Sequence, residues 1–204
     1  MMHRRRQKLN YDILIPKLDK SIFQLNEREA AAYFAWFIGM VPERVAYVSR
    51  VCAAELGVLE ARMDCSPESL LLLWKWFRQR AKTEPDTDTD GEKGGKHFSG
   101  DQRIKTRKLT LETEYILRDI GMYLGETFRK NNPHIDWTYY TQPRRDFFVN
   151  HPLLKGFVDR TFDQPFEASF EPIHMARIQA CKMLDKTSSD GDLFALYQLW
   201  AGKM

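Results

Sequence analysis

The amino-acid sequence predicts an α+β protein that is mostly helical, with about six helices and a small antiparallel sheet within residues 135–170. Over several long segments the apolar residues recur at spacings of three and four, which is the period of an amphipathic helix. Between residues 135 and 170, aromatic and β-branched residues instead form short runs that prolines interrupt, as is typical of short or edge strands. A chain of 204 residues, 43% of them hydrophobic, can bury one self-sufficient core.

Two helices are predicted in the first quarter of the chain. Asn26 has Glu29 three positions later, which is a capping-box pattern, and the alanine-rich run that follows contains strong helix formers. We expect this helix to end near Gly39. Pro42 suits the first turn of a second helix, which extends to the residue before Gly57.

The rest of the chain supplies four more helices and the strands. Ser66 and Pro67 predict the cap and the first residue of one helix. Another begins near Thr110 and ends near Lys130, because Asn131-Asn132-Pro133 stops it. The remaining predicted elements are strands at 135–140, 147–149, 153–158 and 166–170, a helix from Pro172 and a final helix at 193–200.

A single domain is predicted over residues 11–204. A mobile basic arm at residues 1–10 precedes it, and no long apolar run follows that arm, so we expect no secretory signal. Residues 83–101 are rich in acidic residues and glycines and lack aliphatic residues. This composition predicts an exposed acidic loop within the domain.

The charge balance and the cysteine content limit which class of partner and which cellular compartment we expect. The net charge of +3 comes from 31 Lys and Arg against 28 Asp and Glu, a balance that disfavours nucleic acid as the partner. No segment approaches the ~20 apolar residues that cross a bilayer. Cys52, Cys65 and Cys181 form neither a disulfide framework nor a CxxC pair, so we expect reduced thiols and a cytoplasmic protein. The sequence leaves the oligomeric state open.

The helix predicted after Thr110 carries a column of carboxylates. At 100° per residue, Glu112, Asp119 and Glu126 align beside its apolar stripe. One interpretation is an acidic site for a basic partner or a metal. The alternative is ion pairing with Arg144 and Arg145, or simple solvation.

Two glycines occupy the opposite border of the same stripe. Gly121 and Gly125 each cost about 1 kcal/mol in a helix interior relative to alanine. Two such residues four positions apart predict that another backbone or a large ring approaches closely. Trp137 and Tyr139 are the candidate rings.

One sequence motif partly matches a calcium loop. Asp86, Asp88, Asp90 and Gly91 have the spacing of its front half, but His97 stands where the loop needs a bidentate glutamate. The histidines form no HxxxH or HExxH pair, and no glycine-rich nucleotide motif is present. We therefore expect no metal and no cofactor.

Three segments of the chain resemble segments of other proteins. Asp119–Glu126 reads DIGMYLGE, Asn131–Trp137 reads NNPHIDW, and Pro152–Gly156 joins a proline to a hydrophobic-Gly motif. Over roughly residues 110–160 the chain resembles a class of bacterial cytosolic proteins of unknown function. Some proteins of this class accompany polymorphic or contact-dependent toxins as immunity partners. The resemblance implies a binding role and supplies no catalytic motif.

These observations predict a non-enzymatic protein-binding module, and the resemblance implies an immunity-type inhibitor that occludes a toxin. Acidic and aromatic residues would cover a basic substrate-binding surface of such a toxin. Glu126→Lys should then weaken binding without changing the melting temperature. The alternative is a metal-dependent hydrolase or nuclease that uses Asp119 and Glu126. The candidate partner-binding residues are Asp119, Tyr123, Glu126, Trp137, Tyr139, Asp86, Asp88 and Asp90.

Overall fold

The structure is a computed structural model that describes residues 10–86, 107–161 and 163–203. These residues are mostly helical with two small antiparallel sheets, which confirms the predicted fold class. The described residues form α1 (Glu27–Leu56), α2 (Ser69–Arg80), α3 (Leu111–Asn131), α4 (Pro172–Cys181) and α5 (Asp192–Ala201), with the 3₁₀ helices η1 (Ile22–Gln24) and η2 (Glu60–Arg62). The strands are β1 (Thr83–Pro85), β2 (Arg107–Leu109), β3 (Asp136–Thr138), β4 (Leu153–Asp159) and β5 (Phe166–Phe170).

α1 is one continuous helix where the sequence predicted two. Gly39 does not end it, and Pro42 lies inside it. A proline in a helix interior costs about 3 kcal/mol because it removes a hydrogen bond. The buried stripe nevertheless continues across the proline from Phe37 to Val48, so packing of both halves outweighs that cost. The helix ends at Gly57, as predicted, with the left-handed φ of 65° that glycine adopts easily.

The other helix starts follow the sequence closely. The side chain of Thr110 caps α3 by accepting a hydrogen bond from the Thr113 backbone N–H. α4 begins at Pro172, as predicted. α2 begins two residues after the predicted Pro67, at Ser69, whose N–H donates to the Ser66 hydroxyl over 3.3 Å.

The predicted sheet is present, with strand order β3-β4-β5. Trp137 pairs with Leu154 across β3 and β4, and β4 pairs antiparallel with β5. The strand predicted at residues 147–149 is wrong, because this segment is a turn. The Asp146 carboxylate accepts a hydrogen bond from the Phe148 N–H over 2.7 Å, and such local bonds compete with strand pairing.

The sequence did not predict the second sheet, formed by β1 and β2. Thr83 pairs with Leu109, so residues 83–85 of the predicted acidic loop belong to a strand. Each strand has three residues, which is too short for an alternating pattern to be recognised. Residues 87–101 of that loop lie outside the described residues, and so do residues 1–9 of the predicted basic arm.

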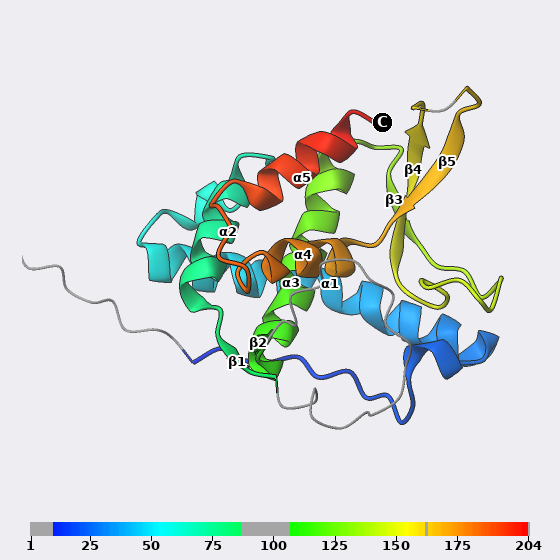
Figure 1. The fold of residues 1–204 in the computed structure, drawn as a ribbon, viewed down its shortest axis with the longest axis horizontal. Helices are drawn as coiled ribbons and strands as arrows, with labels where there is room; N and C mark the ends of the chain where they lie inside the picture. The colour runs from blue at the N-terminus through cyan, green and yellow to red at the C-terminus, as the bar shows by residue number, and fades with distance from the viewer. Residues whose placement is uncertain (1–9, 87–106, 162, 204) are drawn as a thin grey trace, which may run out of the picture.

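α3 lies at the centre of the fold (Figure 1). It contacts α1, α2, α4 and α5. At its C-terminal end the Phe128 ring meets Phe157 of β4 and Phe170 of β5, each at 5.2 Å between centroids. A helix that is covered on several sides must be apolar around much of its circumference. Its buried apolar side chains are Ile116, Leu117, Ile120, Met122, Tyr123, Leu124 and Phe128.

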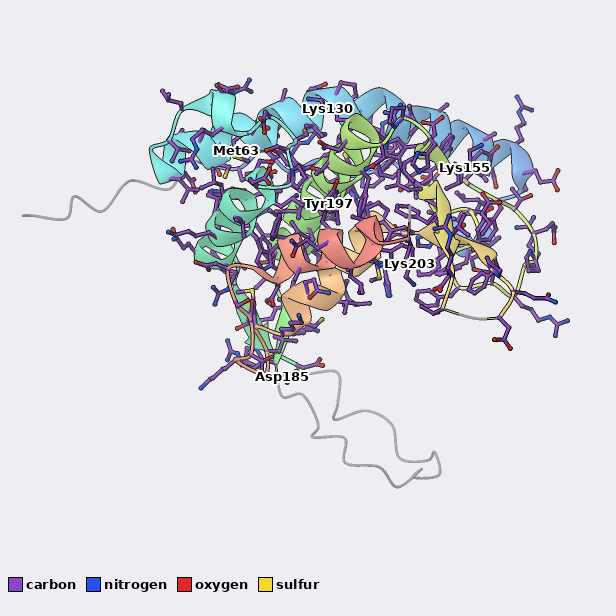
Figure 2. The ribbon with its side chains drawn as sticks, turned by 90° about the horizontal axis from the view of Figure 1, so that it is seen from above. Met63, Lys130, Lys155, Asp185, Tyr197 and Lys203 are labelled. Atoms are coloured by element: carbon purple, nitrogen blue, oxygen red, sulfur yellow. The ribbon has the colours of Figure 1, made fainter. Side chains whose placement is uncertain are left out.

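The C-terminal residues complete the edge of the three-stranded sheet. The Val158 N–H of β4 donates to the Lys203 carbonyl over 2.6 Å, and the Lys203 ammonium donates to the Asp159 carboxylate over 2.5 Å. Figure 2 shows Lys203 beside the strands. The hydrogen bonds from Lys203 and Thr161 lower the pKa of Asp159 to about 2, so this contact persists through mildly acidic pH.

The two α3 glycines allow the close approaches that the sequence predicted. A Cβ at Gly125 would lie 2.2 Å from the Trp137 ring, and a Cβ at Gly121 would lie 2.6 Å from the Ile173 backbone. One glycine therefore admits a ring and the other admits the backbone of α4. Tyr139, the second candidate ring, stacks instead on Phe34 with centroids 4.7 Å apart.

We predict that Gly125→Ala and Gly121→Ala each destabilise the fold by about 1–3 kcal/mol, because the added methyl overpacks the α3 surface. Gly39→Ala is the matched control, since nothing lies within 4 Å of its Cβ position. That variant should gain up to about 1 kcal/mol from helix propensity. Urea unfolding at neutral pH measures all three. Wild-type stability of Gly125→Ala would contradict the close packing.

Candidate functional site

Asp119, the centre of the carboxylate column, is buried in an ion pair. Its side chain is 1% exposed. Arg44 donates to both of its oxygens, from Nε over 3.1 Å and from Nη2 over 2.6 Å, and the Tyr11 hydroxyl donates over 2.5 Å. Burial raises the pKa of Asp119, and the two hydrogen-bond donors oppose that rise. Asp119 therefore does not belong to an exposed acidic face.

The same ion pair fixes residues 11–25, which we call the strap. Burial and the Asp119 charge raise the pKa of Tyr11, so its hydroxyl stays protonated and donates. Arg44 Nη2 also donates to the Asp12 carbonyl over 2.6 Å, and Arg118 donates to the Leu14 carbonyl over 2.8 Å. The strap is thus held to the helices by cationic side chains that bind its backbone.

The other carboxylates of the column are paired as well. Glu126 Oε1 accepts from the Trp137 indole over 2.8 Å and from Arg129 over 2.9 Å. Glu112 accepts from Lys82 over 2.7 Å. Ion pairing, one of the two interpretations of the column, is therefore present, but its cations are Arg44, Arg129 and Lys82. The predicted partners Arg144 and Arg145 are not involved.

This geometry reverses the expectation for Glu126→Lys. The lysine would remove an acceptor from the mostly buried Trp137 indole and would place a second cation beside Arg129. We now expect the substitution to lower the melting temperature, because a buried donor would lose its partner.

The remaining predicted site residues do not share one surface. Tyr123 is buried, donates to the Ser69 hydroxyl over 2.7 Å and accepts from the Cys65 N–H over 3.0 Å. Asp86 pairs with Lys108 over 3.6 Å. Asp88 and Asp90 lie outside the described residues. The structure therefore brings Glu126 and Trp137 together and separates them from Asp86.

The alternative hydrolase site is not assembled by these residues. Asp119 and Glu126 are two helical turns apart, about 10 Å along α3, and each has its own cation. In the part of the chain that the structure describes, no three His, Cys, Asp or Glu side chains lie close enough to hold one metal ion. Burial raises the pKa of Cys52 to about 12 and of Cys65 to about 11, so neither thiol is an activated nucleophile.

The described surface instead presents an aromatic patch that the sequence analysis did not identify. Phe23 of η1 is 44% exposed and Phe147 is 61% exposed, with ring centroids 6.1 Å apart. His174 of α4 lies 5.3 Å from Phe147 and 5.2 Å from Phe148. His151 lies 5.2 Å from Phe23. These five residues, Phe23, Phe147, Phe148, His151 and His174, are called the aromatic patch below.

Local hydrogen bonds hold the patch in place. Arg144 donates to the Leu25 carbonyl over 2.8 Å. Asn150 is buried, has a left-handed φ of 65°, and donates to the carbonyls of Ile22 and Leu25. The 139–151 loop is therefore joined directly to the strap. Both segments that carry the exposed rings Phe23 and Phe147 are therefore held together by hydrogen bonds.

An apolar groove adjoins the patch. It has a volume of about 600 Å³ and lies between the strap and α1. Leu25 lines it and also accepts the hydrogen bond from Arg144, so the groove reaches the end of the strap that the 139–151 loop binds. Its α1 wall includes Tyr33 and Trp36, which stack with centroids 5.6 Å apart.

A second groove, of about 620 Å³, lies between α1, η2 and α3. Figure 2 shows Met63 and Lys130, two of its lining residues, beside α1. Two of its charged groups already bind protein atoms, since Glu126 pairs with Arg129 and Lys130 donates to the Asp64 carbonyl. This second groove therefore offers fewer unengaged polar groups to a ligand than its volume suggests.

Comparison with protein families, with curated proteins and with solved structures found no match to this chain. Among the helices formed by residues 10–86, 107–161 and 163–203, none combines the length and the apolar composition needed to cross a bilayer. The functional interpretation below is therefore argued from the geometry of the chain's own residues.

The sequence held one signal for the patch. Phe147-Phe148 directly follows Arg144-Arg145-Asp146, although the β propensity of the two phenylalanines predicted a strand. Aromatic residues next to arginines in a segment rich in turn formers are typical of an exposed interaction loop. Nothing local marked Phe23, which reaches the patch only through the fold of the strap.

We predict that Asp119→Ala destabilises the protein by about 3–5 kcal/mol, because it leaves the Arg44 charge buried without its carboxylate. Glu112→Ala is the matched control from the same column. Its ion pair with Lys82 is more exposed and should contribute less than about 1 kcal/mol. Thermal melts measure both.

A double substitution distinguishes the free-energy cost of an unpaired buried charge from the cost of lost packing. Arg44→Met combined with Asp119→Leu should recover most of the stability that Asp119→Ala loses, because no charge stays unpaired. A stable Asp119→Ala variant would contradict the structural role of this pair.

Proposed function

We propose that this protein is a non-enzymatic protein-binding module and that the aromatic patch is its binding surface. The observation that carries the proposal is the pair of exposed rings, Phe23 and Phe147, fixed on the surface by hydrogen bonds between the strap and the 139–151 loop. Exposed aromatic clusters are uncommon on proteins without a partner, since water solvates them poorly.

The composition of the patch supports the same proposal. Aromatic residues and arginine are enriched among the residues that dominate binding energy at protein interfaces. Preorganised rings lose little conformational entropy on binding, so their burial contributes more of its free energy to affinity. Phe147, the more exposed ring, is the proposed central anchor.

We propose an immunity-type inhibitor as the specific form of this function. The resemblance of residues 110–160 to bacterial cytosolic proteins, some of them immunity partners, supports this form. Such an inhibitor acts by occlusion and needs no catalytic group. The cytoplasm is its proposed compartment, and the reduced, buried thiols of Cys52 and Cys65 agree with that choice.

We predict that Phe147→Ala raises the dissociation constant for the protein partner at least about 30-fold, which corresponds to the roughly 2 kcal/mol of a hot-spot residue. The partner is first captured with the tagged wild type from host lysate after nuclease treatment. Its affinity for each purified variant is then measured by calorimetry.

Leu199→Ala is the matched control, because Leu199 is 64% exposed but belongs to α5, which contributes no residue to the patch. It should bind as the wild type does. Both variants should melt within about 2 °C of the wild type, since each removes an exposed side chain. Undiminished binding by Phe147→Ala would show that the binding surface lies elsewhere on the protein. A wild type that captures no protein would contradict the proposed function.

A further inference from the structure

Two arginines of the 139–151 loop, Arg144 and Arg145, lie close in sequence to the aromatic patch and are called its rim below. Arg144 and Arg145 precede Phe147 by three and two residues, with Asp146 between, in the exposed part of the 139–151 loop. Arg144 uses Nη1 to bind the Leu25 carbonyl and keeps its other guanidinium N–H groups available for a partner. Arg145 is exposed and forms no hydrogen bond or ion pair with the described residues. Two guanidinium groups therefore border the exposed rings.

Two carboxylates near the patch accept hydrogen bonds from protein donors. Asp146 accepts hydrogen bonds from the Tyr140 hydroxyl over 2.5 Å and from the Phe148 N–H over 2.7 Å. These bonds lower the pKa of Asp146. Glu171 is buried, caps α4 by accepting from the His174 N–H, and lies 3.8 Å from His151. Glu171 thus satisfies internal donors, whereas Asp146 binds both of its donors through Oδ1 and stays half-buried beside the two arginines.

The apolar part of the patch extends along α4. Ile178 lies one helical turn after His174 and is 43% exposed. An apolar row therefore runs from Phe23 through Phe147 and His174 to Ile178. A bound segment can place apolar side chains on this row and polar groups on the rim.

We propose that the partner docks on the aromatic patch through an acidic segment, with an apolar side chain against Phe23 and Phe147 and carboxylates on Arg144 and Arg145. This inference rests on the proposed function and specifies the chemistry of the partner. Arginine binds carboxylates through paired N–H donors, so an acidic segment satisfies the rim directly. Complementary charge also selects the partner and speeds its association.

A protein segment fits this surface better than a nucleic acid does. Bases stack on ring faces, and successive bases need roughly parallel platforms. The Phe23 and Phe147 rings are inclined by 57°, and Phe147 meets His174 at 65°. Inclined rings make a pocket for a branched or aromatic side chain more readily than a stacking platform.

The test is selection of a phage-displayed random dodecapeptide library on the full-length protein, with parallel selection on Phe147→Ala. Peptides that depend on Phe147 and combine an apolar residue with aspartate or glutamate would support the inference. Phe147-dependent peptides that are neutral or basic would overturn the acidic partner while leaving the proposed surface intact. No Phe147-dependent enrichment would overturn both.

Charge reversal then tests the rim with one selected peptide. Arg145→Glu should weaken its binding at least about tenfold, and raising the NaCl concentration from 50 to about 500 mM should weaken binding to the wild type. Lys75→Glu, at an exposed position on α2, is the control for net charge and should bind within about twofold of the wild type. Equal effects of the two substitutions would overturn a specific contact, and so would tight binding of an oligothymidylate that displaces the peptide.

Discussion

The rest of the structure depends on the burial of α3 from several sides. Four helices and the end of a sheet cover it, so it has almost no solvent-facing side on which polar groups could simply be hydrated. Each buried position of α3 that lacks an apolar side chain is therefore accommodated by a residue of a neighbouring element. Gly121 and Gly125 make room for α4 and for Trp137, and Asp119 is neutralised by Arg44. The positions of α1, α4 and β3 follow from these three local requirements.

The buried charge connects the core to the surface. Arg44 belongs to α1 and Asp119 to α3, and together they bind Tyr11 and the backbone of Asp12. The strap that starts there ends at Leu25, where Arg144 of the 139–151 loop holds it. The exposed rings are thus linked to the centre of the fold through the strap, which is hydrogen-bonded at both of its ends. Such support explains how aromatic side chains can stay exposed in a fixed arrangement.

Sequence patterns predicted the features that depend on local chemistry. The capping residues Asn26 and Thr110, the stop at Gly57 and the close approach at Gly125 follow from spacing and residue type. Features that depend on distant partners could not be predicted. Pro42 continues a helix because residues on both sides of it are buried, and the cation of Asp119 comes from 75 positions away. The candidate site shows the same division, since Asp119, Tyr123 and Trp137, which were predicted to meet a partner, are buried in the core.

The strap is bound mainly through its main chain. Arg44, Arg118, Asn150 and Arg144 all donate to strap carbonyls, and Tyr11 is the strap side chain that enters the buried ion pair. A carbonyl is present at every position whatever the side chain, so this attachment places few demands on the residues between positions 15 and 24. Mutations there can alter the outer surface while the segment keeps its course. The fold thus separates the main-chain contacts that attach the strap from the side chains that the strap presents on its outer surface.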